Sequence, residues 1–158
     1  MISRRNLLGA RGKQVILVDH NEKNQAVAGI ESAEIQEIID HHRLGTVQTM
    51  SPVFFRNQPL GCTATIIYQM YQENQIEPPK EIAGLLCAAI LSDTLLFQSP
   101  TCTPMDEATA RTLAKIAQID VVEFCEKRCF KSGAAIFANK ICCRKSAFRI
   151  FKEFHAMS

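Results

Sequence analysis

Asp19, the trio Asp40-His41-His42 and Asp93 each follow an apolar stretch of the chain, and together they offer carboxylates and imidazoles. These side chains are common ligands of divalent transition metals. Two such cations held side by side can clamp a phosphoryl group and activate a water molecule for attack on it. The residue types therefore indicate a metal-dependent phosphohydrolase site. Taken singly, Asp19 could also cap a helix, and Asp93 could be a solvated helix end.

Two of these stretches have the pattern of buried strands. Gln14 to Asp19 and Ile35 to Asp40 are short and rich in β-branched residues, as expected of strands covered on both faces of a parallel sheet. Thr46 to Met50 and Val53 to Arg56 are weaker strand candidates. Parallel strands present their carboxyl ends at one edge of the sheet, where ligands bind. The acidic residues that close the first two strands should therefore meet there.

Helical periodicity follows from residue 62 onward, with apolar residues recurring at intervals of three and four. Thr103-Pro104-Met105-Asp106 resembles a capping box with proline at the first helical position. The four expected helices cover residues 62–74, the segment from Pro78-Pro79 to Asp93, the segment from Pro104 to Ala117, and Val121 to Lys131. Strands that alternate with helices predict an α/β fold with a parallel sheet and helices on both faces.

The two histidines are adjacent at the end of a strand, where successive side chains point in opposite directions. We therefore expect one imidazole to ligate a metal while the other faces a substrate. A carboxylate at the end of an apolar helix, as at Asp93, should be capped, paired or bound to a metal. Both expectations agree with a cation site.

The composition of the chain argues against nucleic acid or a membrane as a partner. The 158 residues carry a formal net charge of +2, but the basic side chains crowd at the two ends and the middle is acidic. The chain therefore lacks the basic stripe of a nucleic-acid-binding protein. The apolar run from Val15 to Val18 is too short for a membrane span or an export signal, although Arg4-Arg5 precedes it. Seven cysteines without a repeated C-x-x-C pair indicate reduced thiols, so we expect a cytoplasmic protein.

Four segments carry a family resemblance that is nearly continuous from about residue 14 to residue 133. The segments are VILVDHNE at 15–22, IIDHHRLG at 38–45, PLGCTATIIYQMY at 59–71 and EIAGLLCAAILSDTLLFQSPTCT at 81–103. They resemble the manganese-dependent, family II inorganic pyrophosphatases of the DHH phosphoesterase superfamily. The resemblance implies a parallel-sheet DHH domain, a smaller C-terminal domain and an active site between the two.

The same resemblance implies a role for each site residue. Asp19 would bridge two metals, His41 and Asp93 would ligate one of them, and His42 would act as the catalytic residue that contacts the substrate and protonates the departing phosphate. The cations would be Mn²⁺ or Co²⁺, and Mg²⁺ can accompany the substrate. The implied reaction is the hydrolysis of pyrophosphate to two phosphates. The resemblance also allows a homodimer.

The resemblance suggests how the chain divides. Residues 1–13 are expected to be an N-terminal remnant or linker, residues 14–133 a partial DHH phosphoesterase domain, and residues 134–158 a divergent tail that leads toward a missing C-terminal domain. The histidine and aspartate pair with which the family begins has no counterpart before Asp19. The domain is therefore expected to be incomplete at its N-terminus. Residues 139–150 lose the family's pattern, which a pair of compensating frameshifts would explain.

Two other functions fit the residues. Within the DHH superfamily, the chain could be an exonuclease, another phosphodiesterase or an exopolyphosphatase, because all of these use similar metals. Outside the enzymes, it could be a non-catalytic fragment that binds a metal weakly or pairs with a partner subunit. Since a two-metal site loses activity steeply with its ligands, the isolated chain is expected to hydrolyse pyrophosphate poorly or not at all.

Overall fold

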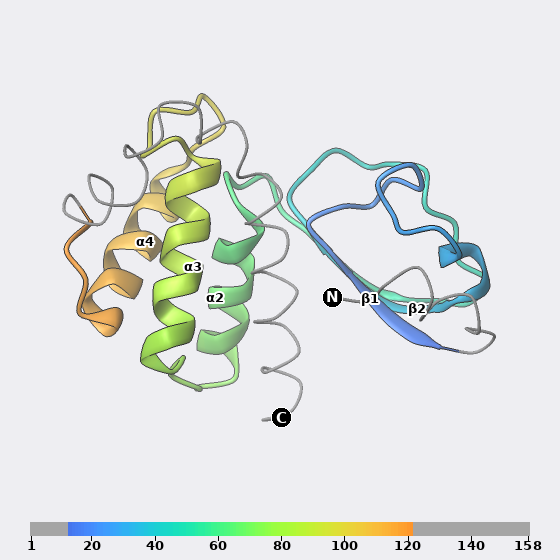
Figure 1. The fold of residues 1–158 in the computed structure, drawn as a ribbon, viewed down its shortest axis with the longest axis horizontal. Helices are drawn as coiled ribbons and strands as arrows, with labels where there is room; N and C mark the ends of the chain where they lie inside the picture. Colours follow the sequence, from blue (N-terminus) through green and yellow to red (C-terminus); the bar gives the residue numbers. More distant parts are fainter. Residues whose placement is uncertain (1–12, 122–158) are drawn as a thin grey trace. The chain divides into compact units, whose positions relative to one another are not determined.

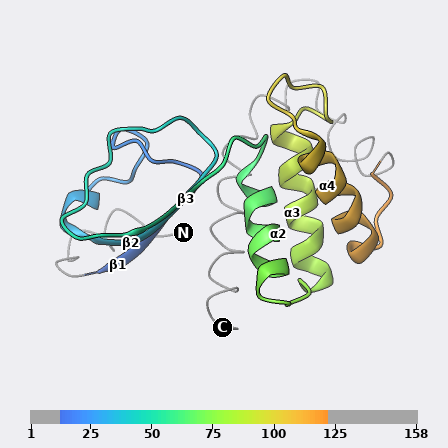
Figure 2. The ribbon, with the colours of Figure 1, turned by 180° about the vertical axis from the view of Figure 1, so that it is seen from behind.

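The computed structural model describes residues 13–121, which form parts of two compact units that divide between Pro59 and Leu60. The first unit contains a three-stranded parallel sheet, and the second contains three helices (Figures 1 and 2). The predicted α/β class with a parallel sheet is therefore confirmed. The expected fourth helix lies outside the described residues except for Val121, and so does the predicted tail 134–158.

The sheet of the first unit has the order β1-β2-β3. Its strands are β1 (Gln14–Val18), β2 (Glu34–Asp40) and β3 (Phe54–Asn57). Both strand pairs are parallel. The burial of β1 and β2 increases toward their carboxyl ends, since the last two residues of β1 and the last three of β2 are buried. The two acidic residues predicted to close these strands thus stand beside the best-packed part of the sheet.

The prediction of a strand over Thr46 to Met50 is wrong, because this segment has no regular secondary structure. It runs as a loop between β2 and β3. The backbone N–H of Val47 donates to the carbonyl of Asn21 at 3.1 Å rather than to a neighbouring strand. The Val47 side chain packs against a small apolar cluster formed by Leu17, Ile30 and Ile38. The β-branched residue that favoured a strand therefore contributes to the core from a loop.

The described part of the second unit contains α2 (Thr63–Glu73), α3 (Lys80–Asp93) and α4 (Pro104–Ala117), with α3 between its neighbours (Figures 1 and 2). The core of this unit consists of apolar side chains that are almost fully buried. Small residues such as Ala83 and Ala110 are fully buried in it, which allows helices to approach closely. Its large side chains with an exposed fraction of 1% or less are Ile66, Ile67, Tyr71, Leu86, Ile90, Leu91 and Leu113.

The capping box predicted at the start of α4 is present. Thr103 Oγ1 accepts a hydrogen bond from the backbone N–H of Asp106 at 3.3 Å, and Asp106 Oδ2 accepts one from the backbone N–H of Thr103 at 2.9 Å. The Asp106 carboxylate also accepts from the backbone N–H of Gly61 and from Thr65 Oγ1. A cap that belongs to one helix thus fastens the start of another. Among the described helices, none has the length and apolar character needed to cross a membrane.

Candidate metal centre

The ends of the three strands bring the predicted residues of the first unit to one edge of the sheet. Val18 pairs with Ile39, and Asp40 pairs with Asn57. Asp19, which follows Val18, donates its backbone N–H to the carbonyl of Ile39 at 2.9 Å. This is the carboxyl edge of a parallel sheet, where ligands bind in α/β proteins.

Asp19 adopts a left-handed backbone conformation, with φ at 66°. Among residues other than glycine, aspartate is one of the few that tolerate this conformation. The turn takes the chain out of β1 and leaves the carboxylate largely buried, with 7% of the residue exposed. Its Oδ1 atom lies 3.3 Å from Nε2 of His41. The strand end thus places a carboxylate beside an imidazole, two groups that can ligate a metal.

Asp19, His41 and His42 form a cluster in which one ligand atom of each residue lies within 4.8 Å of the other two. The two imidazole rings have centroids 4.1 Å apart and are tilted by 59°. One carboxylate with two imidazoles suits Mn²⁺ or Co²⁺ better than Mg²⁺, which prefers a shell of oxygen ligands. The donor set therefore fits a transition-metal cation. The metal and catalytic roles of these residues remain predictions.

The expectation that the two histidines point in opposite directions is wrong. They lie beyond the last residue of β2, where the alternation of a strand no longer applies. Asp40 Oδ1 accepts hydrogen bonds from the backbone N–H groups of both His41, at 2.8 Å, and His42, at 3.2 Å. These two bonds turn the chain, so both rings lie in the same cluster.

Asp40 orients the two histidines of the cluster through hydrogen bonds. It is fully buried, and its Oδ1 also lies 2.7 Å from Nδ1 of His42. Burial alone would raise the pKa of this carboxyl group, but hydrogen bonds from His42 and Asn21 outweigh burial and lower the pKa below its usual value. The group therefore stays ionised and accepts hydrogen bonds near neutral pH.

Two residues of the site, Asn21 and Asn57, carried no role in the sequence-based prediction. Asn21 donates to Asp40 and to the carbonyl of Arg43, and Asn57 Nδ2 donates to the carbonyl of His42 at 2.7 Å. Asp40 itself was part of the signature, but its contacts were not foreseen. The available signal for Asn57 was an amide directly after a predicted strand, whereas Asn21 lies two residues beyond the end of one. His20, by contrast, turns its Nδ1 back to the carbonyl of Val18 at 3.1 Å.

Asp93 is the last residue of α3, in the second unit. It is partly buried, and the next residue, Thr94, is fully buried. Thr94 Oγ1 donates to the carbonyl of Ile90 at 2.6 Å and accepts from the backbone N–H of Phe97 at 3.3 Å. The helix end that carries Asp93 is therefore held in place. The role of Asp93 as a metal ligand remains a prediction.

The chain is similar to several known proteins. The family described as "DHH family, N-terminal domain" matches residues 1–90. The cobalt-dependent inorganic pyrophosphatase of Clostridium perfringens is 53% identical over 140 residues, which cover 89% of this chain and 25% of that protein. The manganese-dependent inorganic pyrophosphatase of Bacillus subtilis is 53% identical over 110 residues, covering 70% of this chain and 36% of that protein.

The fold has a solved relative. A crystal structure from Methanococcus jannaschii, described as a family II inorganic pyrophosphatase, superimposes with a TM-score of 0.67 and 43% sequence identity. The match covers 72% of this chain and 39% of the other. The chain thus spans between a quarter and two fifths of the length of these three relatives. Since the family match covers more than half of the sequence, the chain belongs to the DHH family.

Proposed function

We propose that this chain supplies the ligands of one metal in a centre that hydrolyses inorganic pyrophosphate to two phosphates. The observation that carries the proposal is the convergence of Asp19, His41 and His42 at the carboxyl edge of the sheet. Relatives that are named manganese-dependent and cobalt-dependent inorganic pyrophosphatases share half or more of their aligned residues with this chain. These names support pyrophosphate as the substrate and Mn²⁺ or Co²⁺ as the cofactor.

In this proposal, Asp19 and His41 hold the cation, and Asp93 is a further ligand, as the family resemblance implies. A divalent cation supplies Lewis acidity to phosphoryl oxygens and lowers the pKa of a water molecule. His42 uses its Nδ1 toward Asp40, which leaves Nε2 to contact the substrate; in the doubly protonated ring, Nε2–H would deliver its proton to the departing phosphate and leave the neutral Nδ1–H form. The Asp40 carboxylate orients the ring for that transfer.

The state of the cysteines supports a cellular compartment. Cys62, Cys87 and Cys102 are thiols outside any disulfide in the part of the chain that the structure describes. Free thiols of this kind, two of which are buried, suit the reducing cytoplasm. We therefore place the protein in the cytoplasm. Its proposed substrate is pyrophosphate, and neither nucleic acid nor membrane is a proposed partner. A homodimer is compatible with this assignment.

Metal binding tests the first part of the proposal. Titration calorimetry of the purified chain with Mn²⁺ should give one binding event that Asp19→Asn and His41→Ala each weaken at least ~10-fold, because a ligand is lost. His20→Ala is the matched control, since this neighbouring histidine faces the carbonyl of Val18. Equal affinities in the wild type and all three variants would contradict the proposed ligands.

Substrate choice tests the second part. Phosphate release should be measured from pyrophosphate, short-chain polyphosphate and a short oligonucleotide, each with Mn²⁺, Co²⁺ or Mg²⁺. The proposed ligands Asp19, His41 and Asp93 serve one cation, whereas a two-metal mechanism needs further ligands, so we expect slow turnover that favours pyrophosphate. A preference for the oligonucleotide would assign the chain to the phosphodiesterases of the superfamily. Rapid pyrophosphate hydrolysis would show that the ligand set of this chain is complete.

A further inference from the structure

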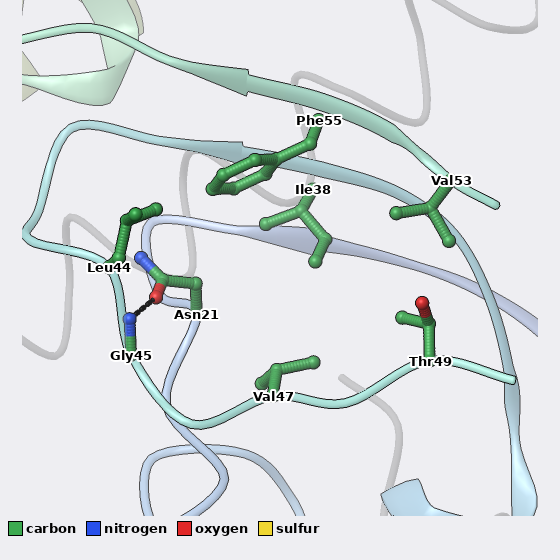
Figure 3. A pocket seen from close by; sticks show the side chains of 8 residues that line it. All are labelled: Asn21, Ile38, Leu44, Gly45, Val47, Thr49, Val53 and Phe55. Atoms are coloured by element: carbon green, nitrogen blue, oxygen red, sulfur yellow. Dashed lines mark hydrogen bonds between the residues drawn. The ribbon is translucent and has the colours of Figure 1, made fainter.

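The side chain of Asn21 connects three separate parts of the site. Its Nδ2 donates to Oδ2 of Asp40 and, at 3.0 Å, to the carbonyl of Arg43, while its Oδ1 accepts from the backbone N–H of Gly45 (Figure 3). An asparagine amide offers two N–H donors and one oxygen. All of them are engaged here. The residue is itself buried, with 5% of its surface exposed.

The loop fits closely around this amide. A Cβ atom at Gly45 would lie 2.6 Å from Oδ1 of Asn21 and closer still to Cγ of Glu22. Both separations are far shorter than carbon atoms tolerate in packed proteins. Glycine at position 45 is therefore a condition for the contact with Asn21.

Hydrogen bonds, rather than packing, hold the first part of this loop. Leu44 is 73% exposed, and a pocket lies between the loop and the sheet, where Ile38 and Phe55 face Val47 and Thr49 (Figure 3). Only further along, at Val47, does the loop pack against the apolar cluster of the unit. The backbone at Arg43 and Gly45, directly after the histidines, is thus tied to Asn21 by hydrogen bonds.

The contact with Asp40 transmits the position of Asn21 to the histidines. Asp40 Oδ2 accepts a hydrogen bond from the amide of Asn21, and Asp40 Oδ1 is the hydrogen-bond partner of His42 Nδ1. The two bonds fix the rotation of one carboxylate from opposite sides. A change at position 21 should therefore turn the carboxylate and release the ring of His42.

We propose that Asn21 is a positioning residue of the metal centre, which ties the end of β1 to Asp40 and to the Arg43–Gly45 backbone so that His41 and His42 face Asp19. Asparagine suits this task because it presents donors to Asp40 and an acceptor to Gly45 at the same time. Aspartate at the same position would set a second carboxylate against Asp40 and the Arg43 carbonyl. The link to metal binding rests on the proposed function, whereas the link to the orientation of His42 does not.

The test compares Asn21→Asp with the wild type in the metal-free chain and in the presence of Mn²⁺. Long-range ¹H–¹⁵N spectra at alkaline pH report which ring nitrogen of His42 carries the proton. In the wild type we expect Nδ1–H, donated to Asp40, and in Asn21→Asp a mixture shifted toward Nε2–H. The Mn²⁺ dissociation constant should rise ~10- to 100-fold, the range found when partners of metal ligands are removed. Asn24→Ala, an exposed asparagine of the same turn, is the matched control and should change neither readout.

The two readouts separate this inference from the proposed function. If the wild type binds no Mn²⁺, the proposed metal centre fails, and the metal-free spectrum still decides the role of Asn21. If Asn21→Asp lacks a native circular dichroism spectrum, Gly45→Ala replaces it, because the added methyl group displaces the same contact. A His42 ring that keeps its wild-type spectrum in a folded variant of either kind would overturn the positioning role.

Discussion

Asp40 Oδ1 lies 2.7 Å from Nδ1 of His42, so the last residue of β2 orients a ring only two positions further along the chain. The same oxygen accepts the backbone N–H groups of His41 and His42. One carboxylate oxygen therefore determines both the path of the chain and the direction of a ring. A change at Asp40 should therefore disturb both the path of the chain and the ring of His42.

Asp40→Asn should weaken Mn²⁺ binding ~10- to 100-fold, although the variant leaves Asp19, His41 and His42 themselves unchanged. The variant puts an amide N–H₂ where the carboxylate accepts hydrogen bonds, so at least one buried donor loses its acceptor. This loss should lower the free energy of unfolding by about 1 to 3 kcal/mol. Calorimetry and urea unfolding, followed by circular dichroism because the chain has no tryptophan, measure the two effects. Glu34→Gln, at the exposed start of the same strand, should alter neither quantity.

Metal binding should also stabilise the folded chain. A ligand that binds only the native state at 100 times its dissociation constant adds about 2.7 kcal/mol to the free energy of unfolding. Mn²⁺ should therefore raise the urea midpoint of the wild type, and EDTA should reverse the change. At the same Mn²⁺ concentration, Asp19→Asn should reduce this stabilisation by about 1.4 kcal/mol or more, which corresponds to a tenfold or greater loss of affinity, since one of the clustered groups is removed. An equal Mn²⁺ shift in this variant would place the binding site elsewhere.

The strands and helix starts were predictable because their signals are local. The apolar runs before Asp19 and Asp40 are short, β-branched and closed by an acid, and they form β1 and β2 within one residue of the expected bounds. The capping box at Thr103 was readable because its two partners stand three residues apart. Sequence alone could therefore place the predicted ligands on the correct elements.

The contacts within the site were not predictable because they depend on residues far apart in the sequence. Asn21 and Gly45 are 24 positions apart, and the bond between them exists only once β1 and β2 are paired. The turn at His41 similarly depends on a side chain that accepts backbone N–H groups, which overrides the alternation of a strand. Thr46 to Met50 was mistaken for a strand because packing against a core and pairing in a sheet favour the same residue types.

In the second unit, Asp106 is a buried carboxylate whose removal should cost considerable stability. It is fully buried and accepts hydrogen bonds from Gly61 N at 2.8 Å, Thr65 Oγ1 at 2.6 Å and Thr103 Oγ1 at 2.6 Å. Asp106→Ala leaves several buried donors without an acceptor, so the free energy of unfolding should fall by roughly 3 kcal/mol or more. Urea unfolding measures the loss.

The matched control for Asp106 is the next residue of the same helix. Glu107 pairs with Arg111 at 2.6 Å on the surface, and Glu107→Gln should change the unfolding free energy by less than about 1 kcal/mol. If the two variants lose the same stability, the buried network around Asp106 does not fasten the start of α2 to that of α4.

Acid should weaken the same network. Burial would raise the pKa of Asp106, but hydrogen bonds from Thr103, Thr65 and Gly61 outweigh it and lower the pKa below the usual value. A carboxyl group with a lowered folded-state pKa adds stability above its unfolded pKa, which is about 4, and loses that contribution as the pH falls through the folded-state value. The difference in unfolding free energy between wild type and Asp106→Asn should therefore shrink below about pH 4. A difference that stays constant down to pH 2 would contradict this assignment.

The turn after α3 offers a test of backbone strain beside Asp93. Leu95, Leu96 and Phe97 all have positive φ values, of 49°, 56° and 66°. A left-handed conformation costs residues with a side chain about 1 to 2 kcal/mol each, whereas glycine adopts it freely. Leu95 is 44% exposed, so comparing two truncations there separates the backbone effect from the loss of the side chain. Leu95→Gly should be more stable than Leu95→Ala by about 1 kcal/mol in urea unfolding.

Ten positions earlier, at Leu85 inside α3, alanine is expected to be more stable than glycine. Leu85 has a similar exposed fraction, 37%, but lies in a regular helix, where glycine is about 1 kcal/mol less favourable than alanine. Leu85→Ala should therefore be more stable than Leu85→Gly. The reversal between the two positions isolates the left-handed backbone as its cause, because both comparisons delete the same side chain. If alanine were the better residue at both positions, the turn that follows Asp93 and Thr94 would be unstrained.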